Sequence, residues 1–183
     1  MVCHIVHGFN ISDGGDGTTD KLIPYLARAG IEHREHNYKF LGLVRGTFQA
    51  RVCNGAEAEI VRAWTRDGDI GIGHSNGCAI LAQAAERGAP FEGLVFINPA
   101  LDESCVVNKS VRWIHVYHSS GDWAVWFSKL LRFRHPWGAM GRVGFTGSDP
   151  RYTNIDISPY GHSEIFKNLH VWGPRIIERI QTA

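Results

Sequence analysis

The stretch that decides the fold is Gly71-Ile72-Gly73-His74-Ser75-Asn76-Gly77. A short apolar run that begins at Asp69 precedes the serine, and an alanine-rich run typical of a helix follows it. A strand, a tight turn and a helix in this order, with glycine two residues before and after a serine, predict a turn that exposes the hydroxyl of Ser75. The turn forces strained backbone angles on its central residue and leaves no room for side chains at 73 and 77. Ser75 is therefore a candidate nucleophile.

The same glycines allow one alternative, a dinucleotide-binding turn. Gly71 and Gly73 match the first two glycines of the G-x-G-x-x-G pattern, but the third would fall at position 76, where the chain has Asn76. No acidic residue at the expected distance ends an obvious second strand. The pattern favours the nucleophile turn.

The composition is that of one soluble globular domain, which we expect to span residues 1–183. Hydrophobic residues make up 44% of the chain and charged residues 20%. The 19 Lys and Arg residues nearly balance the 18 Asp and Glu residues, so the clustered basic excess of a nucleic-acid-binding protein is missing. We expect no nucleic-acid partner.

The sequence also bears on where the protein works. No apolar run approaches the roughly 20 residues that span a bilayer, and the first residues lack the basic start and apolar run of a secretory signal. The four cysteines are far apart and form no CxxC pair, which favours a reducing compartment. We expect a cytoplasmic protein without a membrane span.

Short apolar runs alternate with helical stretches along the chain. This alternation predicts a three-layer α/β/α fold with a mostly parallel, six-stranded sheet. The expected strands are Val2–Val6, Ile31–His36, Asp69–Gly73, Gly93–Ile97, Val111–His118 and Thr153–Ile157. The expected helices are Asp20–Ala29, Ala56–Arg66, Asn76–Arg87 and Pro174–Gln181. Pro24 predicts a late start or a bend in the first helix, and Pro174 suits the first turn of the last.

Two long stretches, Tyr38–Cys53 and Phe127–Pro150, do not fit the alternation. Glycine, arginine and aromatic residues dominate both of them. Long segments of this kind in a compact domain are usually functional loops. We interpret residues 38–53 and 127–150 as possible lids, or else as surface excursions that each contain a short helix.

Four segments together resemble the α/β-hydrolase superfamily. They occur in the family's order, with the nucleophile first, then the acid, then the histidine. The segments are His7-Gly8-Phe9-Asn10, Gly73-His74-Ser75-Asn76-Gly77, Gly121-Asp122-Trp123-Ala124-Val125 and Tyr160-Gly161-His162-Ser163. The first expected strand starts at Val2, so we expect the family's usual first two strands to be missing. The resemblance implies a trimmed α/β-hydrolase fold.

The resemblance implies a catalytic triad of Ser75, Asp122 and His162. Asp122 follows an expected strand, and His162 lies in the loop after the last one. The alternatives are a turn aspartate at 122, a helix-capping histidine at 162, and Asp102 as the acid, since some family members take it from one strand earlier. We expect His74 to pack or to form hydrogen bonds rather than to act as the base.

The resemblance also implies an oxyanion hole and a pocket. The backbone N–H groups of Phe9 and Asn76 would stabilise the negative oxygen of the tetrahedral intermediate. Trp123 and Trp126 flank the expected acid, and further rings follow at Phe127, Phe133 and Trp137. We predict that Trp123 and Trp126 line an apolar substrate pocket. The alternative is that these rings pack the 127–150 segment onto the sheet.

No cofactor or metal is expected. The glycine-rich stretch from Asp13 to Gly17 lacks the Lys-Ser or Lys-Thr of a phosphate-binding loop and the final glutamate of a calcium loop. The histidine pairs 33/36 and 115/118 lie on expected strands, where a spacing of three places the two rings on opposite faces.

These features together predict a serine hydrolase that cleaves a small-molecule acyl substrate, most simply a carboxylic ester, through an acyl-enzyme. Two alternatives stay open. The same triad serves an acyltransferase or a thioesterase, and a binding module can retain the fold without activity.

Overall fold

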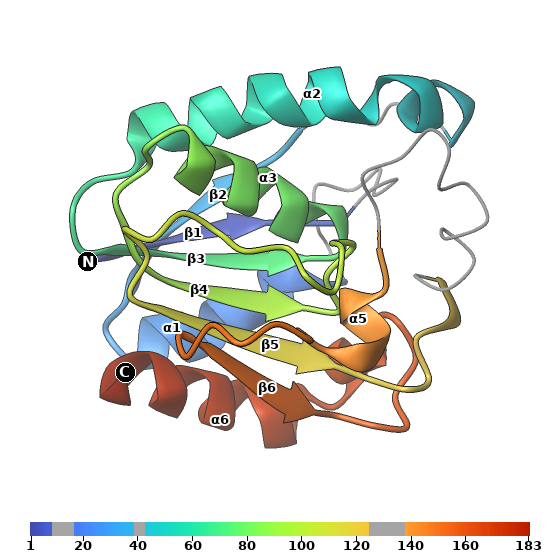
Figure 1. Ribbon diagram of the computed structural model, residues 1–183. Helices are drawn as coiled ribbons and strands as arrows, with labels where there is room; N and C mark the ends of the chain where they lie inside the picture. Colours follow the sequence, from blue (N-terminus) through green and yellow to red (C-terminus); the bar gives the residue numbers. More distant parts are fainter. Residues whose placement is uncertain (9–16, 39–42, 125–137) are drawn as a thin grey trace.

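The computed structural model describes residues 1–8, 17–38, 43–124 and 138–183, with the backbone alone over 43–53. The described strands form a six-stranded sheet with the order β2-β1-β3-β4-β5-β6, and every pairing in it is parallel (Figure 1). The strands are β1 (Val2–Val6), β2 (Glu32–His36), β3 (Asp69–His74), β4 (Phe91–Ile97), β5 (Trp113–His118) and β6 (Tyr152–Asp156). The predicted six strands are confirmed.

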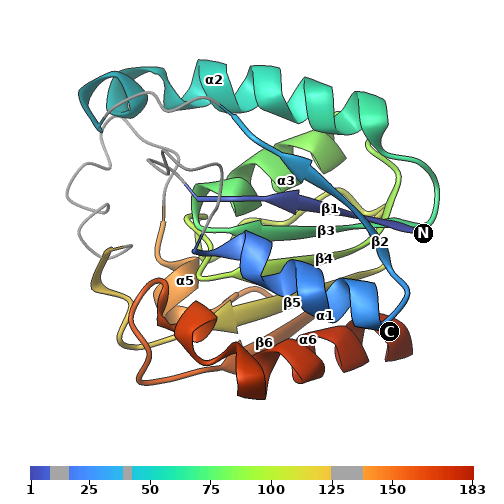
Figure 2. The ribbon, with the colours of Figure 1, turned by 180° about the vertical axis from the view of Figure 1, so that it is seen from behind.

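Helices cover both faces of the sheet, which confirms the three layers. The helices α2 (Leu43–Trp64) and α3 (Asn76–Glu86) lie on one face. On the other face lie α1 (Ile23–Arg28) and α6 (Leu169–Thr182) (Figure 2). Each interface holds its own apolar cluster. A parallel strand covered on both faces reads as a continuous apolar run, and β3 is buried along its whole length.

Helix α2 begins much earlier than predicted. Residues 43–53, expected to belong to a long loop, form its first part instead. The part of α2 that follows, from Asn54 on, packs on α3. A Cβ atom on Gly55 would lie 3.2 Å from the Arg87 guanidinium, and Asn54 is buried with its amide bonded to Asn76. Tertiary packing here outweighs local helix propensity.

Both helices that contain proline begin at residues other than those predicted. A 3-10 turn, η1 (Thr19–Leu22), precedes α1, and Pro24 lies in the first turn of that helix, which confirms the predicted late start. Pro174 does not open the last helix, because α6 already begins at Leu169. A Cβ on Gly173 would lie 2.6 Å from the Tyr25 ring, so close packing on α1 holds this turn in place.

The remaining described elements are α5 (Met140–Val143) and η3 (Glu164–Lys167). Helix α5 lies within the second predicted excursion, of which residues 127–137 fall outside the described residues. None of the described helices combines the length and the apolar character needed to cross a membrane.

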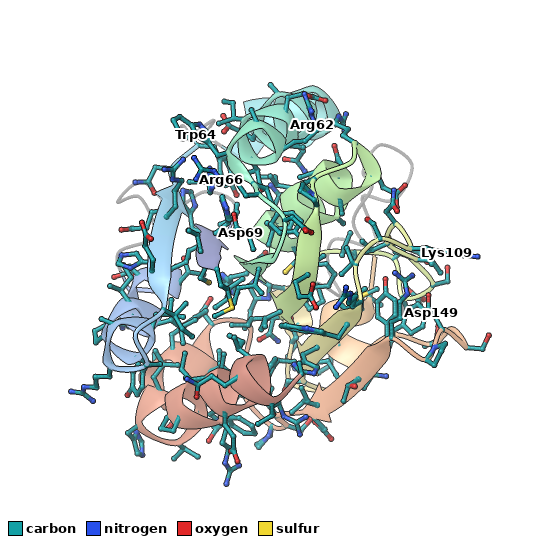
Figure 3. All side chains as sticks on the ribbon, turned by 90° about the vertical axis from the view of Figure 1, so that its left-hand side faces the viewer. Arg62, Trp64, Arg66, Asp69, Lys109 and Asp149 are labelled. Atoms are coloured by element: carbon teal, nitrogen blue, oxygen red, sulfur yellow. The ribbon has the colours of Figure 1, made fainter. Side chains whose placement is uncertain are left out.

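Parallel strands place all their carboxyl ends at one edge of the sheet. The chain leaves β3, β5 and β6 from that edge, which lies on the right in Figure 1. The opposite, amino edge is seen in Figure 3, where Asp69, Lys109 and Asp149 are labelled. Segments that follow β3, β5 and β6 therefore meet at the carboxyl edge, and they carry the three residues of the predicted triad.

Candidate active site

Ser75 occupies a strained turn between β3 and α3. Its φ of 54° and ψ of −120° lie in a region that residues other than glycine rarely adopt. Its backbone N–H donates to Ile97 O at 3.0 Å, and its carbonyl accepts from Ala100 N at 3.1 Å. The end of β4 thus holds the turn in this conformation. Strain of this kind concentrates at functional sites.

The positions around Ser75 require glycine because neighbouring backbone atoms leave no room for a Cβ atom. A Cβ on Gly73 would lie 2.8 Å from Cys78 N, and a Cβ on Gly77 would overlap the carbonyl oxygen of Val6 at the end of β1. Gly8 approaches from the segment after β1, where a Cβ would lie 3.3 Å from Ser75 Cβ. The G-x-S-x-G pattern therefore reflects the packing of α3 onto β1 and β3.

Asp122 and His162 form a hydrogen-bonded pair. His162 Nδ1–H donates to Asp122 Oδ2 at 2.8 Å. Asp122 is completely buried, whereas the His162 side chain is 22% exposed. Because a carboxylate only accepts hydrogen bonds, this contact fixes the proton on Nδ1 and leaves a lone pair on Nε2. This is the tautomer that a general base needs.

The loops that carry this pair are tied to each other. Ser119 Oγ–H, just after β5, donates to Tyr160 O at 2.5 Å and accepts from Gly121 N at 3.1 Å. A Cβ on Gly121 would overlap the Pro159 carbonyl oxygen, so the two loops touch at that point. Glu164 accepts the Gly161 N–H at 2.6 Å and steadies the other side of His162.

His74 links the nucleophile turn to the histidine loop. It is buried, and its Nε2–H donates to the His162 carbonyl at 3.1 Å. Burial, and next the proximity of His162, lower the pKa of His74 to about 3, so its ring is neutral. Among the described residues, no hydrogen bond joins the Ser75 hydroxyl to the His162 ring. Catalytic hydrogen bonds are often long before substrate binds.

Asn76 lies at the start of α3, where backbone N–H groups have no partner within the helix. Its side chain exchanges two hydrogen bonds with Asn54, at 2.8 and 2.9 Å, and donates to the Tyr38 hydroxyl at 3.3 Å. Tyr38 in turn donates to His7 O. This network joins the start of α3 to the segment after β1.

The other predicted residues divide into described and undescribed ones. Asp102 Oδ1 accepts from the backbone N–H and hydroxyl of Ser104, a local turn, while Asp122 holds His162. Trp123 is 55% exposed, and the Arg142 guanidinium lies 4.3 Å above its ring. Phe9 and Trp126, with Phe127, Phe133 and Trp137, lie outside the described residues.

One residue of the site was missed from the sequence. Asn98 follows β4, and its Nδ2–H donates to Asp122 Oδ2 at 3.0 Å. The only local signal is the Asn-Pro step after an apolar run, which is typical of a turn. In the described part of the chain, no cluster of three or more His, Cys, Asp or Glu side chains is arranged to hold a metal ion.

Comparison with known proteins concerns the fold. Neither a protein-family model nor a curated protein matches the sequence. Among solved structures, the chain is similar to a protein from Xanthomonas campestris pv. campestris assigned to the hydrolases of the alpha/beta superfamily, with 21% identity, 100% and 99% of the two chains covered and a TM-score of 0.66.

Two esterase structures are also similar. The esterase domain of a Rhodothermus marinus protein has 15% identity, with 97% of this chain and 84% of that chain covered and a TM-score of 0.61. The Pyrococcus furiosus esterase Pf2001 has 11% identity, with 99% and 82% covered and a TM-score of 0.62. Together with the parallel sheet and the strained serine turn, these likenesses show that the chain has the fold of the α/β-hydrolase superfamily.

Proposed function

We propose that this protein is a serine hydrolase that cleaves small carboxylic esters. The observation that carries the proposal is the strained Ser75 turn at the same sheet edge as the buried Asp122–His162 pair. The esterase function of the R. marinus and P. furiosus structures supports the same reaction class. The Nε2 lone pair of His162 and the exposed side of its ring suit it to remove a proton.

In the proposed reaction, His162 Nε2 takes the Ser75 hydroxyl proton while Oγ attacks the ester carbonyl carbon. The tetrahedral oxyanion is stabilised by the backbone N–H of Asn76, with that of Phe9 as the predicted second donor. Collapse expels the alcohol, which receives the proton from His162. Water, activated by His162, then attacks the acyl-enzyme and releases the acid. Asp122 stabilises the imidazolium at each stage.

Labelling with a fluorophosphonate probe tests the proposal. The intact mass should rise by one adduct, and Ser75→Ala should remove it. Ser104→Ala is the matched control, because Ser104 is an exposed serine bonded to Asp102, and it should label like the wild type. A screen of chromogenic phenyl esters should show turnover that Ser75→Ala abolishes. An adduct that persists in Ser75→Ala would remove the proposal.

A further inference from the structure

Asn98 occupies an unusual place beside the proposed catalytic acid. It is completely buried, and its φ of 44° lies in the left-handed region. Its backbone N–H donates to Tyr117 O at 2.8 Å, which ties it to β5. Asparagine tolerates this conformation better than most residues, but glycine adopts it freely. Backbone conformation alone therefore does not require an amide here.

The Asn98 side chain is directed at the carboxylate. Its Nδ2–H donates to Asp122 Oδ2 at 3.0 Å, and the same oxygen accepts the His162 Nδ1–H at 2.8 Å. Gly141 also lies against the carboxylate, since a Cβ atom on this glycine would be 2.9 Å from Asp122 Oδ2. The Gly141 carbonyl oxygen lies 3.5 Å from Asn98 Nδ2. The carboxylate is thus completely buried and closely surrounded.

The orientation of the amide follows from its neighbours. Both Asp122 Oδ2 and the Gly141 carbonyl accept, so the amide must turn its NH₂ group toward them. Asn98 Oδ1 then remains buried without a hydrogen-bond partner among the described residues. An unsatisfied buried oxygen is unfavourable. A glycine at position 98 would adopt the same backbone conformation without burying an unpaired oxygen. What asparagine adds at this position is the hydrogen bond to Asp122.

We propose that Asn98 is a positioning residue for the hydrolysis: its amide holds Asp122 Oδ2 against His162 Nδ1 and offsets the negative charge of the buried carboxylate. This inference rests on the proposed function. Without the amide, Asp122 Oδ2 loses one of the hydrogen bonds that position it, and the imidazolium formed during proton transfer loses part of its stabilisation. Asn98 acts through Asp122 and touches no reacting atom.

Two variants separate this role from a turn-forming role. Asn98→Gly keeps the left-handed backbone and removes the donor, and kcat should fall about 10- to 100-fold, as for a lost hydrogen bond to a charged group. KM should not change, because substrate does not contact this residue. The matched control is Asn108→Gly, a turn asparagine that caps Ser110 N near the amino edge, and it should keep wild-type kcat. The melting temperature of each variant shows whether it is folded.

Asn98→Asp provides a second test, the pH profile of kcat, which would not change if Asn98 had only a structural role. Aspartate keeps the shape but places a second carboxylate against Asp122, and two adjacent carboxylates favour sharing a proton. Once the shared proton is lost, the second negative charge favours the protonated form of the neighbouring imidazole, so the rise of kcat with pH should lie at higher pH than in the wild type. If folded Asn98→Gly keeps wild-type kcat, or if Asn98→Asp keeps the wild-type pH profile, the proposal is overturned.

A proton NMR experiment keeps this proposal separate from the proposed function. The hydrogen-bonded His162 Nδ1 proton should give a downfield resonance that is absent from His162→Gln, and this resonance should shift or broaden in Asn98→Gly. If the wild type shows no labelling and no turnover, the proposed function fails, and the resonance still decides whether Asn98 positions Asp122. An unchanged resonance in Asn98→Gly would overturn the positioning role.

Discussion

Two buried aspartates each accept a hydrogen bond from a histidine, and the two pairs lie toward opposite edges of the sheet. Asp122 and His162 meet at the carboxyl edge, at 2.8 Å. Asp69, at the amino edge (Figure 3), accepts His4 Nε2–H at 3.2 Å. The pairs use the same chemical groups, so their surroundings must explain any difference in role.

The two histidines differ in what their second nitrogen can reach. His4 is 1% exposed, and its Nδ1 lies 2.8 Å from His36 Nε2. Since Asp69 only accepts, His4 carries its proton on Nε2, and its Nδ1 accepts from His36. Both nitrogens are occupied. His162 Nε2 has no hydrogen-bond partner among the described residues, and its ring is partly exposed.

Asp69 also has a structural role at the amino edge. It accepts the backbone N–H of Val2 at 2.7 Å and that of Arg66 at 2.9 Å, which fastens the starts of β1 and β3. Burial by itself would raise the pKa of Asp69, but the hydrogen bonds from Arg66, Val2 and His4 hold it below its ordinary value. An aspartate–histidine pair thus indicates catalysis only where the imidazole keeps an open nitrogen.

Substitution of the two histidines should give the largest difference between the two pairs. His162→Gln should lower kcat on the order of 10⁶-fold, as loss of the base does in serine hydrolases, with little change in melting temperature. His4→Gln should keep turnover within a few fold and lower the melting temperature, because it disrupts a buried network. Ester turnover and thermal unfolding measure the two effects. A folded His4→Gln protein that no longer reacts with the fluorophosphonate would contradict this interpretation.

The aspartates should separate in the same way. Asp122→Asn should lower kcat about 10⁴-fold, because the amide favours the wrong His162 tautomer. Asp69→Asn should leave kcat nearly unchanged and should lower the unfolding free energy by roughly 1–3 kcal/mol, through weakened hydrogen bonds to a charged group. Asp102→Asn, with its local turn, should change neither kcat nor stability much. A large loss of kcat in Asp102→Asn with little loss in Asp122→Asn would point to the earlier strand as the source of the acid.

Acidification should destabilise the folded chain in part through the amino-edge network. Burial, and then His4 and Arg34, lower the pKa of His36 to about 4, from 6.5. The unfolded chain therefore binds more protons between about pH 6.5 and 4, and the unfolding free energy must fall as the pH drops through that window. Burial lowers the pKa of His4 as well. Urea unfolding at several pH values should show this fall, with a shallower slope in His36→Gln. Equal slopes in the two proteins would assign the effect to other groups.

The smallest expected effect compares two exposed tryptophans. Trp123, beside Asp122, is 55% exposed, and Trp64, at the end of α2, is 56% exposed. Each carries an arginine over its ring, at 4.3 Å for Arg142 and 4.0 Å for Arg34. Trp123→Ala should raise KM a few fold for esters with medium acyl chains, and it should raise KM less for acetyl esters. Trp64→Ala should leave KM unchanged for both kinds of ester. Both variants should keep nearly the wild-type melting temperature. The same KM change in both variants would mean that Trp123 does not line the pocket.

The parts of the molecule that sequence reasoning predicts are those with local causes. The Ser75 turn depends on Gly73 and Gly77, which lie within two residues of it. The central strands β3 and β4 are visible because buried parallel strands are continuously apolar, whereas the outer strands β2 and β6 contain fewer apolar residues and are bounded by turn residues. The Asp122 and His162 assignments came from their places after expected strands.

The parts that it missed depend on contacts distant in sequence. Asn98 meets Asp122 only because β4 pairs with β5, and no pattern near residue 98 encodes that contact. The Asp69–His4–His36 network likewise joins three neighbouring strands. The early part of α2, over residues 43–53, forms despite the glycine content of that segment, and the helix of which it is part packs on α3, a contact that no local pattern encodes.

The hydrogen bond from His74 to the His162 carbonyl has a consequence for folding kinetics. It joins residues 88 positions apart, and the Asp122–His162 bond joins residues 40 positions apart. Contacts of such long sequence separation require much of the intervening chain to be ordered before they are stable. The pair cannot assemble on a partly folded chain that lacks the loop after β6. Recovery of Ser75 reactivity during refolding should therefore follow the docking of that loop rather than the formation of the first helices.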